Sequence, residues 1–386
     1  MAEQLIAGGK VVAPEGVFDP GWVLVSDGVI AAVGTGSAPT AGTDGAPPEV
    51  RDATGHWVMP GFVDIHCHGG GGDSFTDTDP EHVRRAVAAH RRHGTTTILG
   101  SLVSRPVPEL ANQVAALAEL TADGLIAGIH LEGPFLAAAR CGAHDPAILR
   151  PPDDESVRTL LAAGKGAVRM VTIAPELDGA LHAVKRLVGT GVLAAVGHTD
   201  GTGAQVLSAV DAGATVATHL FNGMRPLHHR EPGPIGILLD DERVTVELIC
   251  DLVHVHPSVI RLAARHAGAQ RTVLVTDAIA AAGVGDGVYD VGGLAVTVTD
   301  GVPTLAGGAS LAGSTLTMDA AFRNLVRGCG LSVREAVAAT STQPAEILGV
   351  AKVTGSLTAG LAADVVIMDE SLRAAAVMHQ GTWVTD

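Results

Sequence analysis

Short apolar runs alternate with longer segments of helical periodicity from about residue 58 onward. The apolar runs cover residues 61–66, 95–100, 125–132, 168–174, 191–198, 214–219, 244–250 and 272–277. The segments between them are rich in Ala, Arg and Leu and cover residues 80–92, 106–120, 155–163, 178–189, 203–211 and 256–267. Near-continuous apolar strands that alternate with helices are typical of parallel strands buried on both faces. Eight such units predict an α/β fold, a (β/α)8 barrel of the TIM type.

The two ends of the chain have a different pattern. Residues 4–58 alternate or run apolar, with Asp27-Gly28 as a hairpin signal, and residues 353–386 have the same β-rich character. We expect a small β-sandwich domain built from both chain ends, with bounds 1–58 and 350–386, and a barrel domain at 59–349. Two unrelated extensions are the less economical alternative.

Composition narrows the class of protein. No apolar run is unbroken for the roughly 18 residues that a membrane span needs, and the first residues, MAEQLIAGGK, lack the features of a secretory signal. The cysteines at 67, 141, 250 and 329 show no CxxC spacing, so we expect a reduced, cytoplasmic protein. A formal net charge of −16 argues against nucleic-acid binding, although it leaves an anionic small-molecule ligand open.

Titratable side chains stand at the ends of several predicted strands. They are His66, His68, Glu132, His198, His219 and Asp277. The carboxyl ends of barrel strands meet at one mouth, where active sites of this fold are built. Residues scattered over some 210 positions are therefore predicted to form one site.

The pair His66 and His68 favours a metal site. Side chains at i and i+2 of a strand share a face, so both imidazoles point to the same side and Cys67 points away. Such ligands suit a catalytic Zn²⁺, with Fe²⁺, Co²⁺ or Mn²⁺ left open, and one or two ions per subunit. The four lysines do not end strands, so Glu132 is the expected bridge between two ions. The alternatives are histidines hydrogen-bonded at the barrel rim and a Glu132 that caps a helix.

The strand-end residues together resemble the amidohydrolase superfamily. Longer segments narrow the resemblance to the family of N-acetylglucosamine-6-phosphate deacetylases, and it spans essentially the whole chain. These segments are HLEGPF (130–135), GAHDP (142–146), VGHTD (196–200), HLFNGM (219–224), REPG (230–233), LVTDA (274–278) and LAGSTLTM (311–318).

The resemblance implies roles for individual residues. Glu132, His198 and His219 would bind the principal metal, His66 and His68 a second ion, and Asp277 would be the catalytic acid/base as well as a metal ligand. The residues implied in substrate binding are Ala143, His144, Asn222, Gly223, Arg230, Asp251, His254, Leu311 and Ala312, with Arg230 and His254 at the phosphate end. The resemblance also implies a homodimer in which the partner contributes to the phosphate site. Gly223 and the pair His228-His229 depart from some relatives, which leaves the geometry of phosphate binding open.

The implied reaction is hydrolysis of the acetamide of N-acetyl-D-glucosamine 6-phosphate to D-glucosamine 6-phosphate and acetate, in amino-sugar and cell-wall sugar recycling. A metal-bound hydroxide would attack the carbonyl, because a metal lowers the pKa of its water ligand to roughly 7. Asp277 would take the proton of the water and deliver it to the leaving nitrogen.

Two other functions compete with this one. The first is a hydrolase of another N-acyl amino sugar, a cyclic amide or an N-acyl amino acid. The second is a barrel that has lost catalysis and serves as a binding protein. All six strand-end positions are filled, which favours an enzyme.

Overall fold

The computed structural model describes residues 3–43, 45–308 and 310–385 of the chain. The chain divides into two compact units. One unit runs to residue 64, includes residues 90–97 and resumes at residue 318, and the other contains residues 65–89 and 98–317.

Eight strands form one parallel sheet in the order β15-β14-β13-β12-β11-β10-β9-β6. Their bounds are β6 Phe62–Asp64, β9 Thr95–Val103, β10 Gly128–Glu132, β11 Val168–Ile173, β12 Leu193–Val196, β13 Val216–Ala217, β14 Thr245–Ile249 and β15 Thr272–Val275. Each strand lies in one of the eight apolar runs of the sequence or extends one of them. The spatial order follows the chain order, as expected when each strand is joined to the next by a helical crossover.

The first and last strands of this sheet are linked just past their carboxyl ends. Asp277 donates its backbone N–H to the carbonyl of His66 at 2.8 Å, and His68 donates to the carbonyl of Ala278 at 2.8 Å. The sheet is therefore nearly closed, and the predicted (β/α)8 barrel is confirmed.

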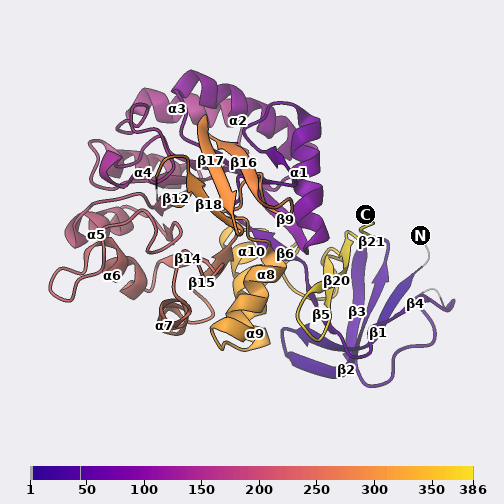
Figure 1. Cartoon of the computed structure of the whole chain (residues 1–386). Coiled ribbons are helices and arrows are strands. Elements are labelled where there is room, and N and C mark those ends of the chain that lie inside the picture. The colour runs from indigo at the N-terminus through magenta and orange to yellow at the C-terminus, as the bar shows by residue number, and fades with distance from the viewer. Residues whose placement is uncertain (1–2, 44, 309, 386) are drawn as a thin grey trace. The chain divides into compact units, whose positions relative to one another are not determined.

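Helices follow one another around the strands (Figure 1). Their bounds are α1 Pro80–Arg92, α2 Val107–Ala122, α3 Asp154–Gly164, α4 Ala180–Gly189, α5 Gly203–Asp211, α6 Gly233–Asp240 and α7 Pro257–Ala267, with a 3₁₀ turn at Ala138–Arg140. The sequence pattern predicted all of these helices except α6. Local chemistry starts several of them: the Asp153 carboxylate accepts the N–H of Ser156 at 2.8 Å, and Thr202 and Gln205 form a capping box at α5.

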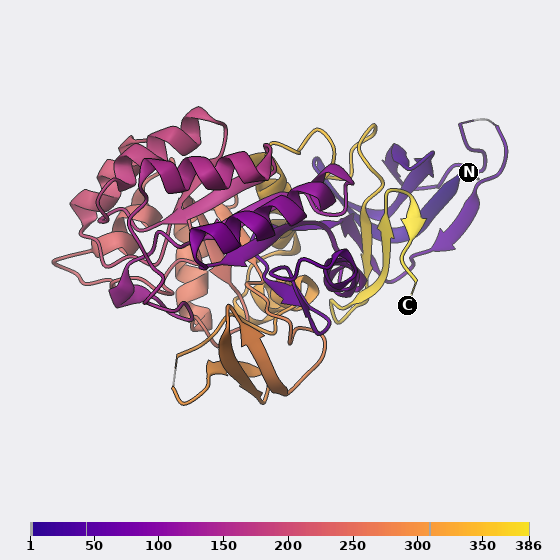
Figure 2. The same cartoon turned by 90° about the horizontal axis from the view of Figure 1, so that it is seen from above.

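A small antiparallel sheet follows the last barrel strand. It consists of β16 (Gly287–Val291), β17 (Leu294–Thr299) and β18 (Val302–Leu305), drawn in orange in Figure 2. Its buried side chains Val291, Val296 and Val298 pack with Ile279 and Ala312. The sequence analysis did not predict this sheet. A two-stranded ribbon, β7 (Gly69–Gly70) with β8 (Asp73–Ser74), follows the His66–His68 segment.

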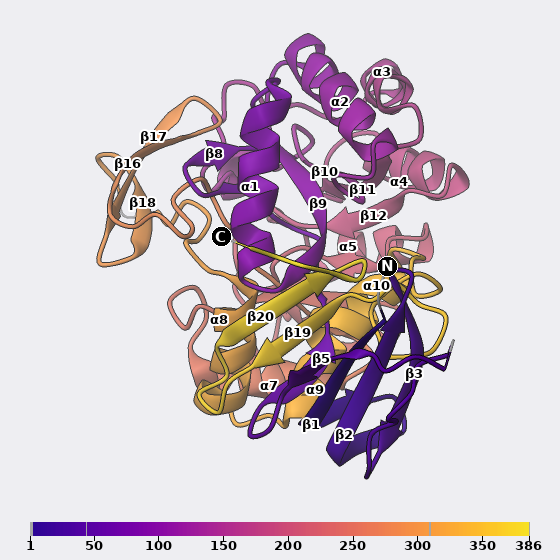
Figure 3. The same ribbon diagram turned by 90° about the vertical axis from the view of Figure 1, so that its right-hand side faces the viewer.

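Both chain ends build a separate eight-stranded sheet, in the order β21-β20-β19-β5-β1-β2-β3 with β4 also paired to β1. The strands are β1 Gln4–Ala13, β2 Gly16–Ser26, β3 Val29–Thr35, β4 Glu49–Asp52, β5 Trp57–Pro60, β19 Val365–Met368, β20 Ala374–His379 and β21 Thr382–Trp383. Figure 3 shows the C-terminal strands β19 and β20 in yellow beside the indigo N-terminal strands. The union of the two chain ends is confirmed. The predicted turn is also present, because Asp27 and Gly28 have φ values of 49° and 81° between β2 and β3.

The unit that contains this sheet also includes helical segments near the C-terminus. They are α8 Met318–Arg323, α9 Val333–Val337 and α10 Gln343–Ile347, with π-helical turns at Asn324–Gly328 and Ala338–Thr342. The prediction placed these residues in the barrel domain, and its domain bounds stay a prediction. No helix in the described part of the chain has the length and apolar character to cross a membrane.

Candidate active site

The strand-end residues occupy equivalent positions in the barrel. Glu132 is the last residue of β10, while His66, His198, His219 and Asp277 each lie two residues beyond the last residue of β6, β12, β13 and β15. His68 follows His66 by two positions. All six side chains are buried, with exposed fractions between 0% and 7%. Because these residues lie at the same level of the barrel, at the ends of their strands, side chains far apart in sequence reach one another.

The backbone turns sharply where three of these side chains leave their strands. His198, His219 and Asp277 have φ values of 46°, 27° and 48°, in the left-handed region that non-glycine residues rarely adopt. Such conformations persist where the surrounding structure holds them, and they cluster at functional sites. The barrel hydrogen bonds hold at least one of them, because Asp277 is tied to His66 through its N–H.

One group of ligand atoms surrounds the Oε1 atom of Glu132. This oxygen lies 2.9 Å from Nε2 of His198 and 2.9 Å from Nε2 of His219, and the two nitrogens are 3.1 Å apart. The three residues form a cluster able to hold a metal ion. We call it the first donor set.

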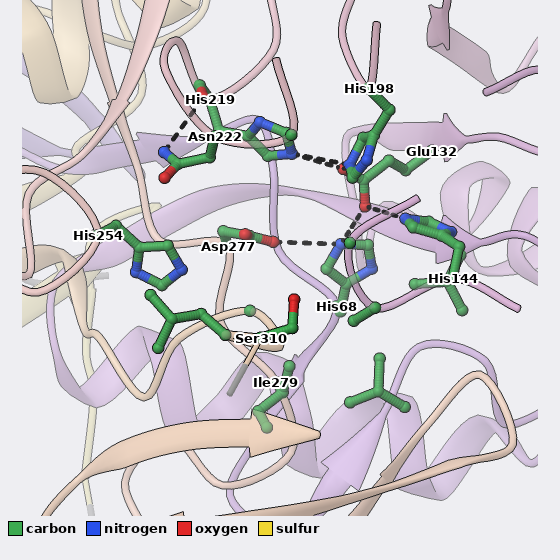
Figure 4. Close-up of a pocket in the computed structure, with 17 residues that line it drawn as sticks. His68, Glu132, His144, His198, His219, Asn222, His254, Asp277, Ile279 and Ser310 are labelled. Atoms are coloured by element: carbon green, nitrogen blue, oxygen red, sulfur yellow. Dashed lines mark hydrogen bonds and ion pairs between the residues drawn. The ribbon is translucent and has the colours of Figure 1, made fainter. Parts of the chain in front are cut away.

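A second group surrounds the other oxygen of the same carboxylate. Oε2 of Glu132 lies 3.0 Å from Nε2 of His68 and 3.5 Å from Nε2 of His66, and these nitrogens are 3.1 Å apart. Oδ1 of Asp277 lies 3.3 Å from His68 and 3.4 Å from His66. These four residues are the second donor set. Figure 4 shows Glu132 between His198 and His219 on one side and His68 on the other.

Hydrogen bonds on the far side of the rings orient the ligand nitrogens. Nδ1 of His198 donates to the carbonyl of Arg140 at 2.8 Å, and Nδ1 of His68 donates to the carbonyl of Ser101 at 3.2 Å. In the neutral form each ring then presents the Nε2 lone pair to the site, which is the arrangement that metal-binding histidines use.

Cys67, fully buried, contacts the carbonyl of Gly69 through its thiol at 3.5 Å.

The buried carboxylates of the site stabilise positive charge on the histidines beside them. Burial raises the pKa of Asp277, but the neighbouring His66 and His68 hold it down at about 2. Burial lowers the pKa of His68, but hydrogen bonds to Asp277 and Glu132 raise it to about 9. Both shifts favour the charged form. A divalent cation meets the same demand and displaces the histidine protons, so the donor atoms fit a metal site.

His144 faces the same carboxylate from the pocket side. The backbone N–H of Ser104 donates to Nδ1 of His144 at 3.3 Å, and Nε2 lies 3.5 Å from Oε2 of Glu132. Burial lowers the pKa of His144, although hydrogen bonding to Glu132 opposes the shift. The ring is therefore neutral, with its proton on Nε2, and offers a hydrogen-bond donor to the site.

A pocket opens beside the two donor sets (Figure 4). Six of the nine predicted substrate residues line it: Ala143, His144, Asn222, Gly223, His254 and Leu311. Asp251 stands behind His254, whose Nδ1 lies 2.6 Å from its carboxylate. Ala312 is buried in the cluster under the β16–β18 sheet. Arg230 lies on an exposed loop, where its guanidinium contacts Nε2 of His229 at 2.9 Å.

Sequence reasoning missed the apolar wall of this pocket. Val103, Ile279 and Val291 line it from the end of β9, the loop after β15 and the end of β16. Ordinary apolar residues carry no local signal for a binding role. A glycine at a positive φ does carry a local signal. At Gly223, where φ is 59°, an added Cβ would lie 2.9 Å from Nδ1 of His198. Glycine at 223 thus permits the close approach of this loop to His198.

A third carboxylate lies below the donor sets and was also missed. Glu247 is fully buried in β14, and its Oε2 lies 3.2 Å from Nδ1 of His66. A lone acid inside the apolar run VTVELIC was the available signal, because a charged residue is rarely buried without a partner.

A barrel with such a constellation at its mouth defines a class of metal-dependent hydrolases. The chain belongs to the amidohydrolase family, whose sequence model matches residues 57–384. The non-enzymatic alternative is therefore not supported.

Individual relatives narrow the comparison. A structure of N-acetyl-D-glucosamine-6-phosphate deacetylase from Mycobacterium smegmatis, a substitution variant in complex with N-acetyl-D-glucosamine-6-phosphate, is 45% identical with a TM-score of 0.95, over 100% of both chains. The N-acetylglucosamine-6-phosphate deacetylase of Bacillus subtilis (strain 168) is 32% identical over 99% of this chain and 97% of its own. The N-acetylgalactosamine-6-phosphate deacetylase of Escherichia coli O157:H7 is 36% identical over 96% of this chain and 97% of its own.

Proposed function

We propose that the protein hydrolyses the acetamide of N-acetyl-D-glucosamine 6-phosphate to D-glucosamine 6-phosphate and acetate. The observation that carries the proposal is the Glu132 carboxylate, whose two oxygens face two histidine pairs with Asp277 beside them at the floor of a pocket. The similarity to deacetylases of this substrate, over the full chain, supports the choice of sugar.

The proposed metal ligands are the residues of the two donor sets. Glu132, His198 and His219 would hold the principal ion, and His66, His68 and Asp277 would share Glu132 in holding a second one. A divalent cation, proposed as Zn²⁺, supplies Lewis acidity: it acidifies water and polarises a carbonyl. Imidazole and carboxylate donors also suit Fe²⁺, Co²⁺ and Mn²⁺.

Two side chains of the protein, Asp277 and His144, are the proposed proton-transfer and hydrogen-bond donor groups. Asp277 has a lowered pKa and lines the pocket, so it would enter the reaction ionised and act first as a base toward water. The same group would then protonate the amine as it leaves. His144 would donate from Nε2 to the acetyl oxygen as negative charge develops there.

The sugar phosphate would extend from the donor sets toward His254. Asn222, Gly223 and Leu311 are the proposed contacts of the sugar, and His254, held by the Asp251 carboxylate, is the proposed cationic contact of the phosphate. An exposed Arg230 is compatible with the homodimer that the family resemblance implies, in which the neighbouring subunit completes the phosphate site. We also propose that the protein works in the cytoplasm, in amino-sugar recycling.

A second candidate substrate is N-acetyl-D-galactosamine 6-phosphate, the epimer at C4. The 36% identity to the Escherichia coli deacetylase of that sugar favours its inclusion. Acetate release should be measured on both sugar phosphates and on unphosphorylated N-acetyl-D-glucosamine, together with the metal content. The proposal predicts the highest kcat/KM for N-acetyl-D-glucosamine 6-phosphate, and it is wrong if none of the three sugars releases acetate.

The variant Asp277→Asn tests the proton-transfer role. We expect kcat to fall roughly 10²–10⁴-fold, because general acid–base catalysis contributes about that much. KM should change little, and the ion held by Glu132, His198 and His219 should remain in a metal analysis. A wild-type kcat in this variant would rule out Asp277 as the acid/base.

A further inference from the structure

Glu247 is a buried acid that belongs to neither donor set. It lies in the middle of β14, between buried apolar neighbours, and its side chain is fully shielded from solvent. A carboxylate in such surroundings is costly unless it is hydrogen-bonded and its charge is balanced. Its contacts therefore indicate what it does.

One oxygen of Glu247 serves both halves of the metal site. Oε2 lies 3.2 Å from Nδ1 of His66, a residue of the second donor set. The same oxygen accepts the backbone N–H of His219, a residue of the first donor set, at 3.1 Å. Oε1 has no hydrogen-bond partner among the described residues. The carboxylate is thus directed at the two histidines.

The contact with His66 fixes both the tautomer and the plane of that ring. A proton on Nδ1, donated to Glu247, leaves Nε2 as the lone-pair nitrogen, 3.1 Å from Nε2 of His68. Two neighbouring rings confine the His66 ring further. The ring centroid of His130 lies 4.5 Å from that of His66 in an edge-on contact, and the ring centroid of His219 lies 5.4 Å away. His66 is therefore held in the orientation that a cation between His66 and His68 requires.

The charges of the site add a second argument. Glu132, Asp277 and Glu247 are three buried carboxyl groups, and among the described residues their ion-pair partners are all histidines. A divalent cation brings two positive charges in place of the histidine protons that it displaces. A third carboxylate beside His66 therefore adds negative charge that favours a second cation at the second donor set.

We infer that Glu247 is a positioning residue for the second cation: its carboxylate orients His66 and supplies the negative charge that a second divalent ion needs. The inference deepens the proposed function and rests on its metal site. It assigns a role to a residue that acts through His66, outside the two donor sets and the pocket lining.

The test is Glu247→Gln, which keeps the shape of the side chain and removes its charge. Each protein is equilibrated with buffered Zn²⁺ over a range of free concentrations, and the bound metal per chain is counted. We expect two ions in the wild type and a second-ion affinity lowered roughly 10–100-fold in the variant, because an uncharged amide oxygen holds the Nδ1 proton of His66 less strongly and supplies no negative charge. The affinity for the first ion should stay within about twofold, because the Gln oxygen still accepts from His219.

A matched control is available elsewhere in the chain. Asp364 is also a buried carboxylate bonded to an imidazole, Nδ1 of His379, at 2.9 Å. Asp364→Asn should leave both Zn²⁺ affinities unchanged. If it lowers the second affinity as much as Glu247→Gln does, the effect is general destabilisation and the inference is wrong.

Thermal unfolding separates positioning from simple stabilisation of the fold. At one fixed free Zn²⁺ concentration, metal should raise the Tm of Glu247→Gln by less than it raises the Tm of the wild type, because a weaker second site contributes less by mass action. A purely structural role would lower Tm by the same amount with and without metal, and two ions bound with wild-type affinity would also overturn the inference. Because these readouts need no substrate, failure to release acetate would count against the proposed reaction and leave the role of Glu247 standing.

Discussion

Single side chains in this site act through partners that hold them. His254 illustrates the point, because its Nδ1 lies 2.6 Å from the Asp251 carboxylate while the rest of the ring lines the pocket. Burial lowers the pKa of His254, but the hydrogen bond and charge of Asp251, together with the charge of Asp277, raise it above the usual value. The imidazolium form therefore persists to higher pH than it does in a free histidine, and a cation is available for a phosphate.

This pairing predicts a pH dependence of substrate preference. The raised pKa means that the His254 charge is fully present below about pH 6.5 and is lost as the pH rises through the folded value. A phosphate is a dianion above about pH 7, so its own ionisation adds little there. We expect the ratio of kcat/KM for the phosphorylated over the unphosphorylated sugar to fall roughly 10-fold or more at high pH, the size of a lost charge-assisted hydrogen bond.

The variant Asp251→Asn is the control for this pH profile. Without the carboxylate that raises the pKa, the fall in the ratio should begin at lower pH. If the two sugars keep a constant ratio from about pH 6.5 to about pH 9, His254 does not contact the phosphate through its charge.

Among the secondary-structure elements, the small β16–β18 sheet supplies part of the pocket wall. Val291 lies in the wall of the pocket, while Val296 and Val298 pack with Ile279 beneath the sheet. The sheet thus forms one side of the pocket from outside the barrel. Its amino acids contribute shape to the pocket and no reacting group.

The variant Val296→Ala tests the contribution of this sheet. Val296 is fully buried, so losing two methyl groups should cost about 2 kcal/mol in packing around the pocket wall. We expect KM to rise several-fold, with unchanged metal content and a smaller change in kcat. Val288→Ala, at a position of the same sheet that is 75% exposed, should leave KM unchanged. Equal effects of the two substitutions would show that packing under the sheet does not shape the pocket.

For the whole molecule, the metal site ties stability to metal binding. Three buried carboxyl groups, those of Glu132, Asp277 and Glu247, have histidine partners. Ions that bind the native state alone stabilise that state by mass action. At a free ion concentration about 100 times Kd the gain is about 2.7 kcal/mol for each site.

Removal of the metal by a chelator is therefore predicted to lower Tm by several degrees. Added Zn²⁺ should restore Tm, whereas added Mg²⁺ should not, because imidazole donors favour zinc over magnesium. Calorimetry of the same sample before and after chelation is the measurement. An unchanged Tm in the metal-free protein would contradict a metal centre that contributes to folding.

The sequence by itself determined the architecture and the positions of the reactive groups. Apolar runs of strand length and helical segments are local patterns, since burial on both faces leaves a continuous apolar run, and all eight barrel strands coincide with runs of this kind. The polar residues at the ends of these runs, from His66 to Asp277, were placed at one mouth by the known geometry of the fold. The Asp27-Gly28 turn was likewise a property of two adjacent residues.

Only the tertiary structure decided how those groups face one another. That Glu132 presents one oxygen to each histidine pair, and that Glu247 supports His66 from 181 positions away, depends on side-chain directions that no local pattern encodes. The apolar pocket wall and the exposed position of Arg230 were hidden for the same reason, because an ordinary valine or a loop arginine acquires its role from what the fold brings beside it. Periodicity along the chain reports burial, whereas a site is made by contacts between distant segments.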